Sequence, residues 1–238
     1  MSNGFDGKRV VITGGSGALG SAVVQALASA GANCEVTWVS ESEQKHLAPR
    51  DRVRYTRVDV TDELAVRGFY ESLPDLWGSI HLVGGFAIAP LTETSADDFR
   101  KMFTTNALSC FLCCREATRA IRRTAGAGSA AAAAGGRIVN TAARPALSPV
   151  GGMIAYSTSK AAVASITQSL AEELKGERIL VNAVAPSLMD TPANRKAMPT
   201  ADFSKWPKVE QVARAIAFLA SPENELTSGA VVPVYGQV

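Results

Sequence analysis

The fold is decided by Thr13-Gly14-Gly15-Ser16-Gly17-Ala18-Leu19-Gly20, a glycine-rich stretch that follows a short apolar run and opens a helical one. Gly15, Gly17 and Gly20 satisfy the spacing G-x-G-x-x-G in the strand-to-helix position that this spacing requires. Glycines at such a turn let the backbone approach a pyrophosphate, whose charge is stabilised at the N-terminus of the helix. The stretch therefore predicts a dinucleotide-binding site on the first strand of an α/β pattern.

Strand-like and helix-like stretches alternate along the rest of the chain. This alternation is typical of right-handed βαβ units and predicts an α/β fold, a doubly wound sheet of about seven parallel strands with helices on both faces. We expect strands at 9–13, 34–39, 52–58, 80–83, 136–141, 179–185 and 231–235, and helices at 18–30, 96–123 with a break near Thr105, 155–175 and 209–220.

Two stretches interrupt this alternation. Residues 125–136 (AGAGSAAAAAGG) are low in complexity, which is typical of a mobile connection between elements. Residues 187–206 follow a strand end, contain Pro192 and Pro199, and are long for a loop inside a compact domain. Because loops of this length often cover active sites, we expect a substrate lid at 187–206.

Composition limits the class of protein. The chain has 238 residues, of which 47% are apolar and 19% charged, with a net charge of +2. This is enough apolar material for one large core, so we expect residues 1–238 to form a single domain. The lack of a basic block argues against a nucleic-acid partner, and the lack of a run of about 18 apolar residues argues against a membrane span. Asp6 and Gly7 stand where a secretory signal would be apolar, which favours the cytoplasm.

Three of the four cysteines, Cys110, Cys113 and Cys114, share one helical face. This spacing can serve a metal, but neither of the two histidines lies near it in the sequence. Cysteine also packs well as a small buried residue. We therefore expect reduced thiols in a cytosolic core and no metal.

The end of the second expected strand bears on the choice of dinucleotide. An acid about 20 positions after the glycines would bind the adenosine ribose and favour NAD. Trp38 occupies this position, with Val39 and Ser40 after it. The missing acid removes a repulsion against a 2′-phosphate, although no arginine stands there to attract one. The sequence thus leaves NAD and NADP open and favours NADP.

Tyr156 and Lys160 lie four residues apart at the start of an expected helix, and therefore on one face of it. A phenol titrates near 10 in water, which is too high for proton transfer near neutrality. A neighbouring ammonium is expected to lower the pKa of the phenol and make it a useful proton donor or acceptor. For the two residues alone, a surface pair without function is the plain alternative.

Together, these features resemble the short-chain dehydrogenase/reductase family from Lys8 to Tyr235. The resemblance is carried by the glycine turn, Asp59-Val60, Asn106, Tyr156-xxx-Lys160 and Pro186 followed by Thr191. It implies a single-domain Rossmann-like fold and an NAD(P)(H)-dependent oxidoreductase. It also implies that Tyr156 is the general acid/base, that Lys160 holds the nicotinamide ribose and tunes the tyrosine, and that Asn106 supports a water-linked proton path. The cofactor-binding residues that it implies are Gly14, Gly15, Ser16, Gly17, Ala18, Leu19, Gly20, Trp38, Asp59, Val60, Gly84, Gly85, Tyr156, Lys160, Pro186, Ser187, Met189 and Thr191.

Two positions depart from the family pattern. The second glycine of the family's turn falls at Ala18, next to Gly17, and the more important departure concerns the serine. The catalytic serine of the family falls thirteen residues before the tyrosine, where this chain has Ala143. A methyl group cannot donate a hydrogen bond to a substrate oxygen, and donors of this kind contribute a few kcal/mol. Either Thr141 or Ser148 replaces the serine, or the substrate does not need that donor. We expect Ala143, Arg144 and Ser148 at the substrate pocket, with a solvent-exposed Arg144 as an equal alternative.

A narrower resemblance concerns the substrate. Segments 15–21, 152–156, 190–192, 194–196, 198–199 and 201–204 are similar to those of dihydropteridine reductases. Those enzymes reduce a quinonoid, imine-like ring system and also lack the serine, although they carry an aspartate in place of Trp38 and lack Asn106. This favours a quinonoid dihydropterin or a similar conjugated heterocycle as substrate.

Two other functions remain open from the sequence. One is a general carbonyl or alcohol oxidoreductase, acting on ketone or 3-oxoacyl substrates, in which Thr141 or Ser148 takes the place of the serine. The other is a non-catalytic NAD(P)-binding sensor. As for partners, residues 155–175 carry small side chains that allow close helix packing, and the family resemblance implies a homodimer or homotetramer.

Overall fold

The computed structural model describes residues 4–45, 47–126 and 135–238. Within these residues, seven strands form one sheet in the order β3-β2-β1-β4-β5-β6-β7, and all neighbours are parallel. The predicted doubly wound α/β fold is confirmed. The strands are β1 (Arg9–Thr13), β2 (Asn33–Trp38), β3 (Val53–Arg57), β4 (Gly78–His81), β5 (Gly136–Thr141), β6 (Ile179–Pro186) and β7 (Val231–Val234).

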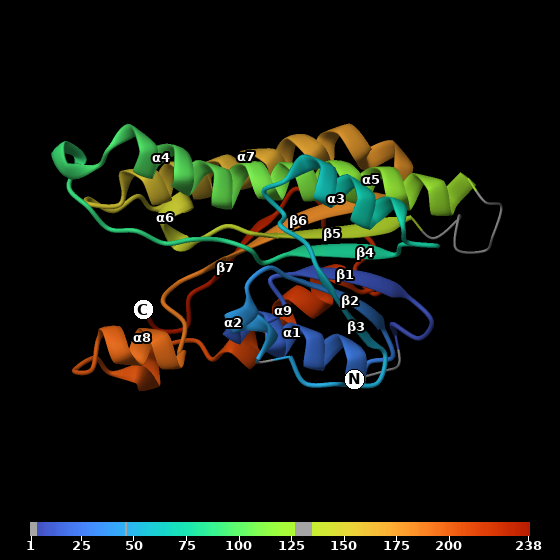
Figure 1. The fold of residues 1–238 in the computed structure, drawn as a ribbon, viewed down its shortest axis with the longest axis horizontal. Coiled ribbons are helices and arrows are strands. Elements are labelled where there is room, and N and C mark those ends of the chain that lie inside the picture. Colours follow the sequence, from blue (N-terminus) through green and yellow to red (C-terminus); the bar gives the residue numbers. More distant parts are fainter. Residues whose placement is uncertain (1–3, 46, 127–134) are drawn as a thin grey trace.

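Helices cover both faces of the sheet (Figure 1). On one face lie α1 (Ala18–Ser29) and α9 (Val209–Ala220), and on the other lie α3 (Glu63–Glu71), α5 (Ser109–Gly126) and α7 (Ile154–Leu174). Because successive strand residues point to opposite faces, Val10 and Ile12 pack in the core under α1 and α9, whereas Val11 packs under α3, α5 and α7. The sheet is thus buried on both sides, as its apolar strands predict.

Shorter elements lie mostly at the carboxyl ends of the strands. They are α2 (Glu41–Gln44), α4 (Ala96–Phe103), a π-helical turn (Thr104–Leu108), α6 (Arg144–Leu147), α8 (Pro192–Ala197) and 3₁₀ turns at Leu91–Glu93, Lys175–Glu177 and Phe203–Lys205. In a parallel sheet of this kind, ligands bind beyond the carboxyl ends of the strands, where the strand order reverses. Here the strand order reverses between β1 and β4, so a ligand site is expected beyond the carboxyl ends of these two strands.

The structure corrects several sequence-based boundaries. β4 begins two residues before the predicted start at Ile80, because Gly78 and Ser79 already pair with β1. Helix α3 was not predicted, although Asp62 caps it by accepting from the N–H groups of Leu64 and Ala65. The predicted lid at 187–206 contains α8 and the last 3₁₀ turn. Most of the low-complexity stretch 125–136 lies outside the described residues. No helix within the described parts of the chain is long and apolar enough to cross a membrane.

Candidate active site

The turn after β1 brings backbone segments unusually close together. Gly14 has a φ of +69°, a region that favours glycine, and its carbonyl accepts from the Gly17 N–H at 3.2 Å. A Cβ on Gly20 would lie 2.2 Å from the Gly14 carbonyl oxygen, so only glycine lets α1 begin this near the strand. No side chain caps the first turn of α1 at Gly17. Its N–H groups therefore face outward, as an anion-binding helix N-terminus requires.

A cleft of about 380 Å³ opens beside this turn. Much of the predicted cofactor set lines it, namely Gly14, Ser16, Gly17, Trp38, Asp59, Val60 and Gly84. Sequence reasoning missed others that line it, among them Glu43, Thr61 and Thr105. The structure thus joins the ends of β1, β2 and β4 and the segment after β3 into one groove beside the glycine turn.

The remaining predicted cofactor residues lie around this cleft. Gly15, Leu19 and Gly20 are buried and shape the turn, and Ala18 is exposed at the start of α1. Pro186 ends β6, and Ser187, Met189 and Thr191 follow it toward α8, where Thr191 caps that helix through the Asn194 N–H. Ser187 Oγ donates to the Tyr235 carbonyl at 2.6 Å. These four are not among the residues that line the cleft, so their contact with a cofactor stays a prediction.

Tyr156 is half-buried near the start of α7, and its ring meets Phe86 edge-on with 4.9 Å between centroids. Burial raises the pKa of Tyr156 to about 12. The sequence predicted that the neighbouring ammonium lowers the pKa of Tyr156. For the protein alone this prediction is wrong, because burial disfavours the charged phenolate and has the larger effect. At neutral pH the phenol holds its proton.

Lys160 lies one turn further along α7 and is 5% exposed. Its Nζ donates to the Thr141 carbonyl oxygen at 2.8 Å, which ties α7 to the end of β5. Burial lowers the pKa of Lys160 to about 8, and Cys110 opposes this with a smaller effect. The ammonium is thus fixed at the sheet edge.

Asn106 lies in the π-helical turn between α4 and α5, at the break predicted near Thr105. Its Oδ1 accepts from the Gly85 N–H at 2.8 Å, and its Nδ2 donates to the Gly85 carbonyl at 3.1 Å and to Ser159 Oγ at 2.9 Å. Such turns insert an extra residue in a helix and are frequent at functional sites. In this structure the amide clamps the loop after β4 to α7. A role in a water-linked proton path stays a prediction.

Gly84 joins the cleft to these side chains. A Cβ at this position would lie 2.7 Å from Asn106 Oδ1 and 3.0 Å from Lys160 Nζ. Gly84 also lines the cleft. Because glycine has no side chain, nothing at this position separates the cleft from Lys160 and Asn106. The residues present therefore fit a bound nicotinamide dinucleotide, and the placement of Lys160 and Tyr156 at its reactive end stays a prediction.

The same family that the sequence resembles is found when the chain is compared with models of known protein families. Residues 8–202 match the family model described as short chain dehydrogenase. The chain belongs to the short-chain dehydrogenase/reductase family. Like the characterised members it resembles, it is an NAD(P)-dependent oxidoreductase.

Curated relatives of this short-chain dehydrogenase/reductase act on different alcohols. It is 36% identical to galactitol 2-dehydrogenase of Rhizobium johnstonii, over 97% of this chain and 94% of the relative. It is 28% identical to meso-2,3-butanediol dehydrogenase of Serratia marcescens, over 98% and 94%. A solved structure of ElxO with NADP bound is 26% identical, with a TM-score of 0.85 and coverage of 96% and 97%. None of these three is a dihydropteridine reductase, and that narrower resemblance stays a prediction.

The position of the family's serine is apolar in this reductase. Ala143 is buried just before α6. Ser148 is exposed at the end of α6, and Arg144 is exposed with its guanidinium 5.3 Å from the centre of the Tyr235 ring. Thr141 Oγ1 is buried and has no hydrogen-bond partner. Strand alternation directs Thr141 to the same face as Val139, the face of α1 and α9, whereas Tyr156 comes from α7 on the other face.

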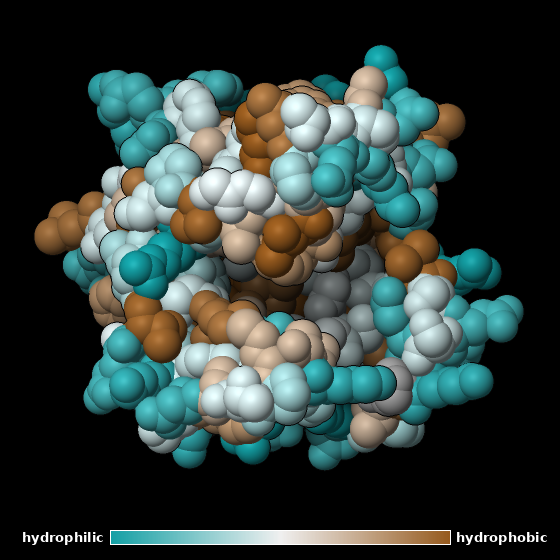
Figure 2. Space-filling model, turned by 90° about the vertical axis from the view of Figure 1, so that its left-hand side faces the viewer, coloured by the Kyte–Doolittle hydropathy of each residue, from teal (hydrophilic) through white to brown (hydrophobic). Residues whose placement is uncertain are grey.

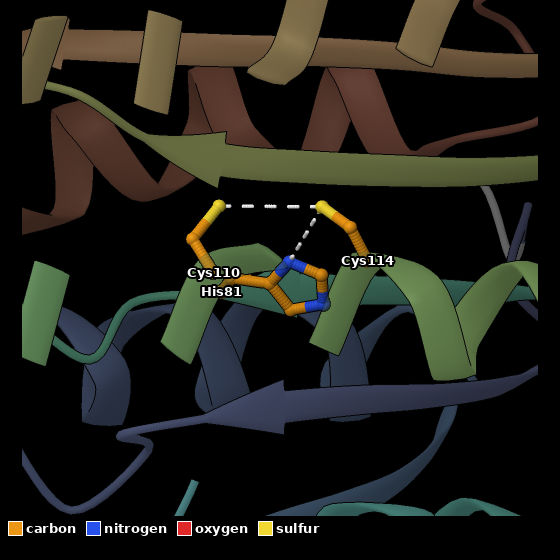
Figure 3. A group of neighbouring side chains, drawn as sticks. All are labelled: His81, Cys110 and Cys114. Carbon is orange, nitrogen blue, oxygen red and sulfur yellow. Dashed lines mark hydrogen bonds between the residues drawn. The ribbon is translucent and has the colours of Figure 1, made fainter. Parts of the chain in front are cut away.

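The structure also brings His81 of β4 beside Cys110 and Cys114 of α5 (Figure 3). The ligand atoms of the three buried side chains lie within 4.8 Å of one another, so a histidine that is distant from these cysteines in the sequence lies beside them in space. Asn140 Nδ2 donates to Thr167 Oγ1, which turns Asn140 Oδ1 toward His81 Nδ1 at 2.8 Å and Cys114 Sγ at 3.4 Å. Ser79 Oγ lies 2.8 Å from the other ring nitrogen. These contacts are those of a hydrogen-bonded core, and all four cysteines are buried free thiols, as predicted.

Proposed function

We propose that this enzyme transfers hydride between NAD(P)(H) and a flat, conjugated ring system, of which a quinonoid dihydropterin is the test case. The observation that carries the proposal is the buried methyl group of Ala143 at the position where the family has a hydroxyl donor. A conjugated imine-like ring accepts hydride and a proton without a fixed hydroxyl on a carbonyl oxygen. A simple ketone loses a few kcal/mol of transition-state stabilisation when such a donor is removed.

The surroundings of Tyr156 support a flat, largely apolar substrate. Figure 2 views the side of the molecule on which α6 and α8 lie, and it shows a central hollow with hydrophobic residues on its rim. Phe86, which contacts the Tyr156 ring, is 61% exposed. Several other large apolar side chains on the loops after β4 and β5 and at the start of α7 are exposed too, namely Ile88, Leu91, Leu147, Val150 and Ile154. Leu91, Val150 and Ile154 line a common pocket, and exposed apolar side chains gathered at a pocket are typical of a ligand-binding surface.

The chain's own residues account for the proton. When bound, the dinucleotide supplies or accepts the hydride. Tyr156 holds a proton at neutral pH, because burial raises the pKa of its phenol, and it gives this proton to the substrate atom that gains the electron pair. We expect the Lys160 ammonium, one helical turn away, to stabilise the phenolate that remains once the dinucleotide and the substrate are bound. A protonated phenol is the form of Tyr156 that reduction of the substrate requires.

A second candidate is a secondary alcohol or ketone as substrate. The unpartnered hydroxyl of Thr141 favours it, because this group is a hydrogen-bond donor without an acceptor in the protein. The alcohols named for the relatives also favour it. This candidate requires the Thr141 side chain to leave the face of α1 and α9, toward which strand alternation directs it, and to reach the substrate beside Tyr156 in place of the missing serine.

Steady-state turnover with a quinonoid dihydropterin and a panel of ketones, each with NADH and NADPH, separates the two candidates. We expect faster turnover of the conjugated ring and little loss of it in Thr141→Val. Ala143→Ser is expected to raise ketone turnover, because it restores a donor. Fast ketone turnover in the wild type that falls at least about tenfold in Thr141→Val, but not in Ser148→Ala, would establish the second candidate instead.

A further inference from the structure

An acidic side chain lies in the dinucleotide cleft at a place that the sequence did not indicate. Glu43 comes from α2, the short helix after β2, whose N-cap Ser40 accepts from the Glu43 N–H at 3.3 Å. The Glu43 carboxylate turns back toward the sheet. Its Oε2 accepts from Ser16 Oγ at 3.1 Å and from the Val39 N–H at 3.0 Å. Glu43 therefore bridges the glycine turn after β1 and the end of β2.

This position is the one at which a dinucleotide-binding fold meets the adenosine ribose. An acid at the end of the second strand accepts hydrogen bonds from the ribose hydroxyls, whereas a 2′-phosphate needs donors or cations at the same place. Ser16, Trp38, Val39 and Glu43 all line the cleft. Two donors from residues that line the cleft, Ser16 Oγ and the Val39 N–H, are both bound to the Glu43 carboxylate.

We propose that Glu43 makes this enzyme select NAD(H) over NADP(H). It supplies from α2 the acid that is missing at Trp38, and it holds the donors that a 2′-phosphate would need. The inference rests on one part of the proposed function, namely that a nicotinamide dinucleotide binds in this cleft. It reverses the preference for NADP that the sequence alone favoured.

A cation at the same corner does not offset this charge. Arg57, at the end of β3, donates from Nε to the Val39 carbonyl at 3.1 Å, and its guanidinium lies 5.9 Å from the Trp38 ring. The side chain is exposed, so its charge is screened by water and salt. Arg50 is directed away, to Gln25 and Ser21 of α1. Within the described residues, Glu43 is thus the charged group that contacts Ser16 and the Val39 N–H.

The size of the effect follows from simple electrostatics. A 2′-phosphate carries nearly two negative charges at neutral pH. Even with the screening of bulk water, a carboxylate about 4 Å from such a group weakens binding by on the order of tenfold to thirtyfold. The neutral amide of Glu43→Gln keeps the shape of the side chain and removes the repulsion.

Equilibrium titration of the full chain with NADH and NADPH at physiological salt tests the proposal. We expect the wild type to bind NADH at least about tenfold more tightly than NADPH. In Glu43→Gln the Kd for NADPH should fall about tenfold, whereas the Kd for NADH should rise, because a neutral amide accepts weaker hydrogen bonds from the ribose hydroxyls than a carboxylate does. The matched control is Glu41→Gln, since Glu41 is exposed on the same helix and has no contact with Ser16 or Val39; both Kd values should stay as in the wild type.

The outcomes distinguish failure of this proposal from failure of the proposed function. Tight binding of both dinucleotides with a ratio that is unchanged in Glu43→Gln overturns the role of Glu43 and leaves the oxidoreductase intact. If the wild type prefers NADPH and Arg57→Ala loses this preference, the role of Glu43 is refuted and Arg57 determines the choice of dinucleotide. If neither dinucleotide binds to the folded wild type, the cofactor site itself is refuted.

Discussion

The buried ammonium of Lys160 should lower the stability of the fold, and Lys160→Met tests this. Displacement of the lysine pKa from 10.5 to about 8 means that folding makes the charged form less favourable. Each pKa unit corresponds to about 1.4 kcal/mol, so the cost at neutral pH is about 3 kcal/mol. The variant also loses the hydrogen bond to the Thr141 carbonyl, which contributes about 1 kcal/mol. We therefore expect Lys160→Met to raise the free energy of unfolding by about 2 kcal/mol at pH 7.

The pH dependence identifies the cause. The folded-state pKa lies below that of the unfolded chain, so the unfolded chain binds the additional proton between pH 8 and about 10.5. Over this window the wild type becomes more stable relative to the variant as pH rises. The gain from Lys160→Met should be full below pH 8 and should shrink steadily above it.

Urea unfolding at several pH values from 6.5 to 10 measures this difference, with activity assayed on the same samples. Lys101→Met is the matched control, because Lys101 is exposed on α4, and its effect should stay within about 0.5 kcal/mol. Activity should be lost in Lys160→Met and kept in the control. A Lys160→Met protein less stable than the wild type at pH 7, or a gain that does not change with pH, would refute the reasoning.

Three further predictions follow from the site and the fold. Tyr156→Phe should lower kcat by about 10² to 10⁴ and leave the Kd for the dinucleotide unchanged, as stopped-flow and titration measure; unchanged turnover would refute Tyr156 as the proton donor. Gly20→Ala should destabilise the protein and weaken dinucleotide binding, because its Cβ would lie 2.2 Å from the Gly14 carbonyl oxygen; a normal melting temperature with normal binding would contradict this. The chain should run as a homodimer or homotetramer in light scattering, with the exposed Phe111 of α5 and the neighbouring Ile166 and Leu170 of α7 covered by a second copy; a monomer would contradict this.

The architecture could be predicted from local patterns, because parallel strands buried on both faces are apolar runs that end at glycines. β1, α1, β5 and α9 lie within a residue of their predicted ranges. β4 was misplaced because Gly78 and Ser79 have little strand preference of their own and are held by β1 and β5 on either side. The failure to predict α3 is different, since the cap at Asp62 was visible in the sequence.

The site was predictable where chemistry depends on spacing along one element, and not where it depends on tertiary contact. Tyr156 and Lys160 share a helix, so their proximity follows from the sequence. The raised pKa of Tyr156 does not, because burial by Phe86 and its surroundings comes from distant segments. Glu43 and His81 were missed for the same reason. The spacing Ser40-x-x-Glu43 could have indicated the start of α2, but not that the carboxylate reaches Ser16.

The π-helical turn at Thr104–Leu108 has a consequence for how this chain can tolerate changes in length. Such a turn holds one residue more than an ordinary α-helical turn. Loss of one residue here would let α4 and α5 run on as a regular helix, with the sheet-facing side of α5 still in phase. The core under α5 would survive such a deletion, whereas Asn106 would no longer reach Gly85. A deletion in this turn would therefore remove the hydrogen bonds between Asn106 and Gly85 while the rest of the fold persists.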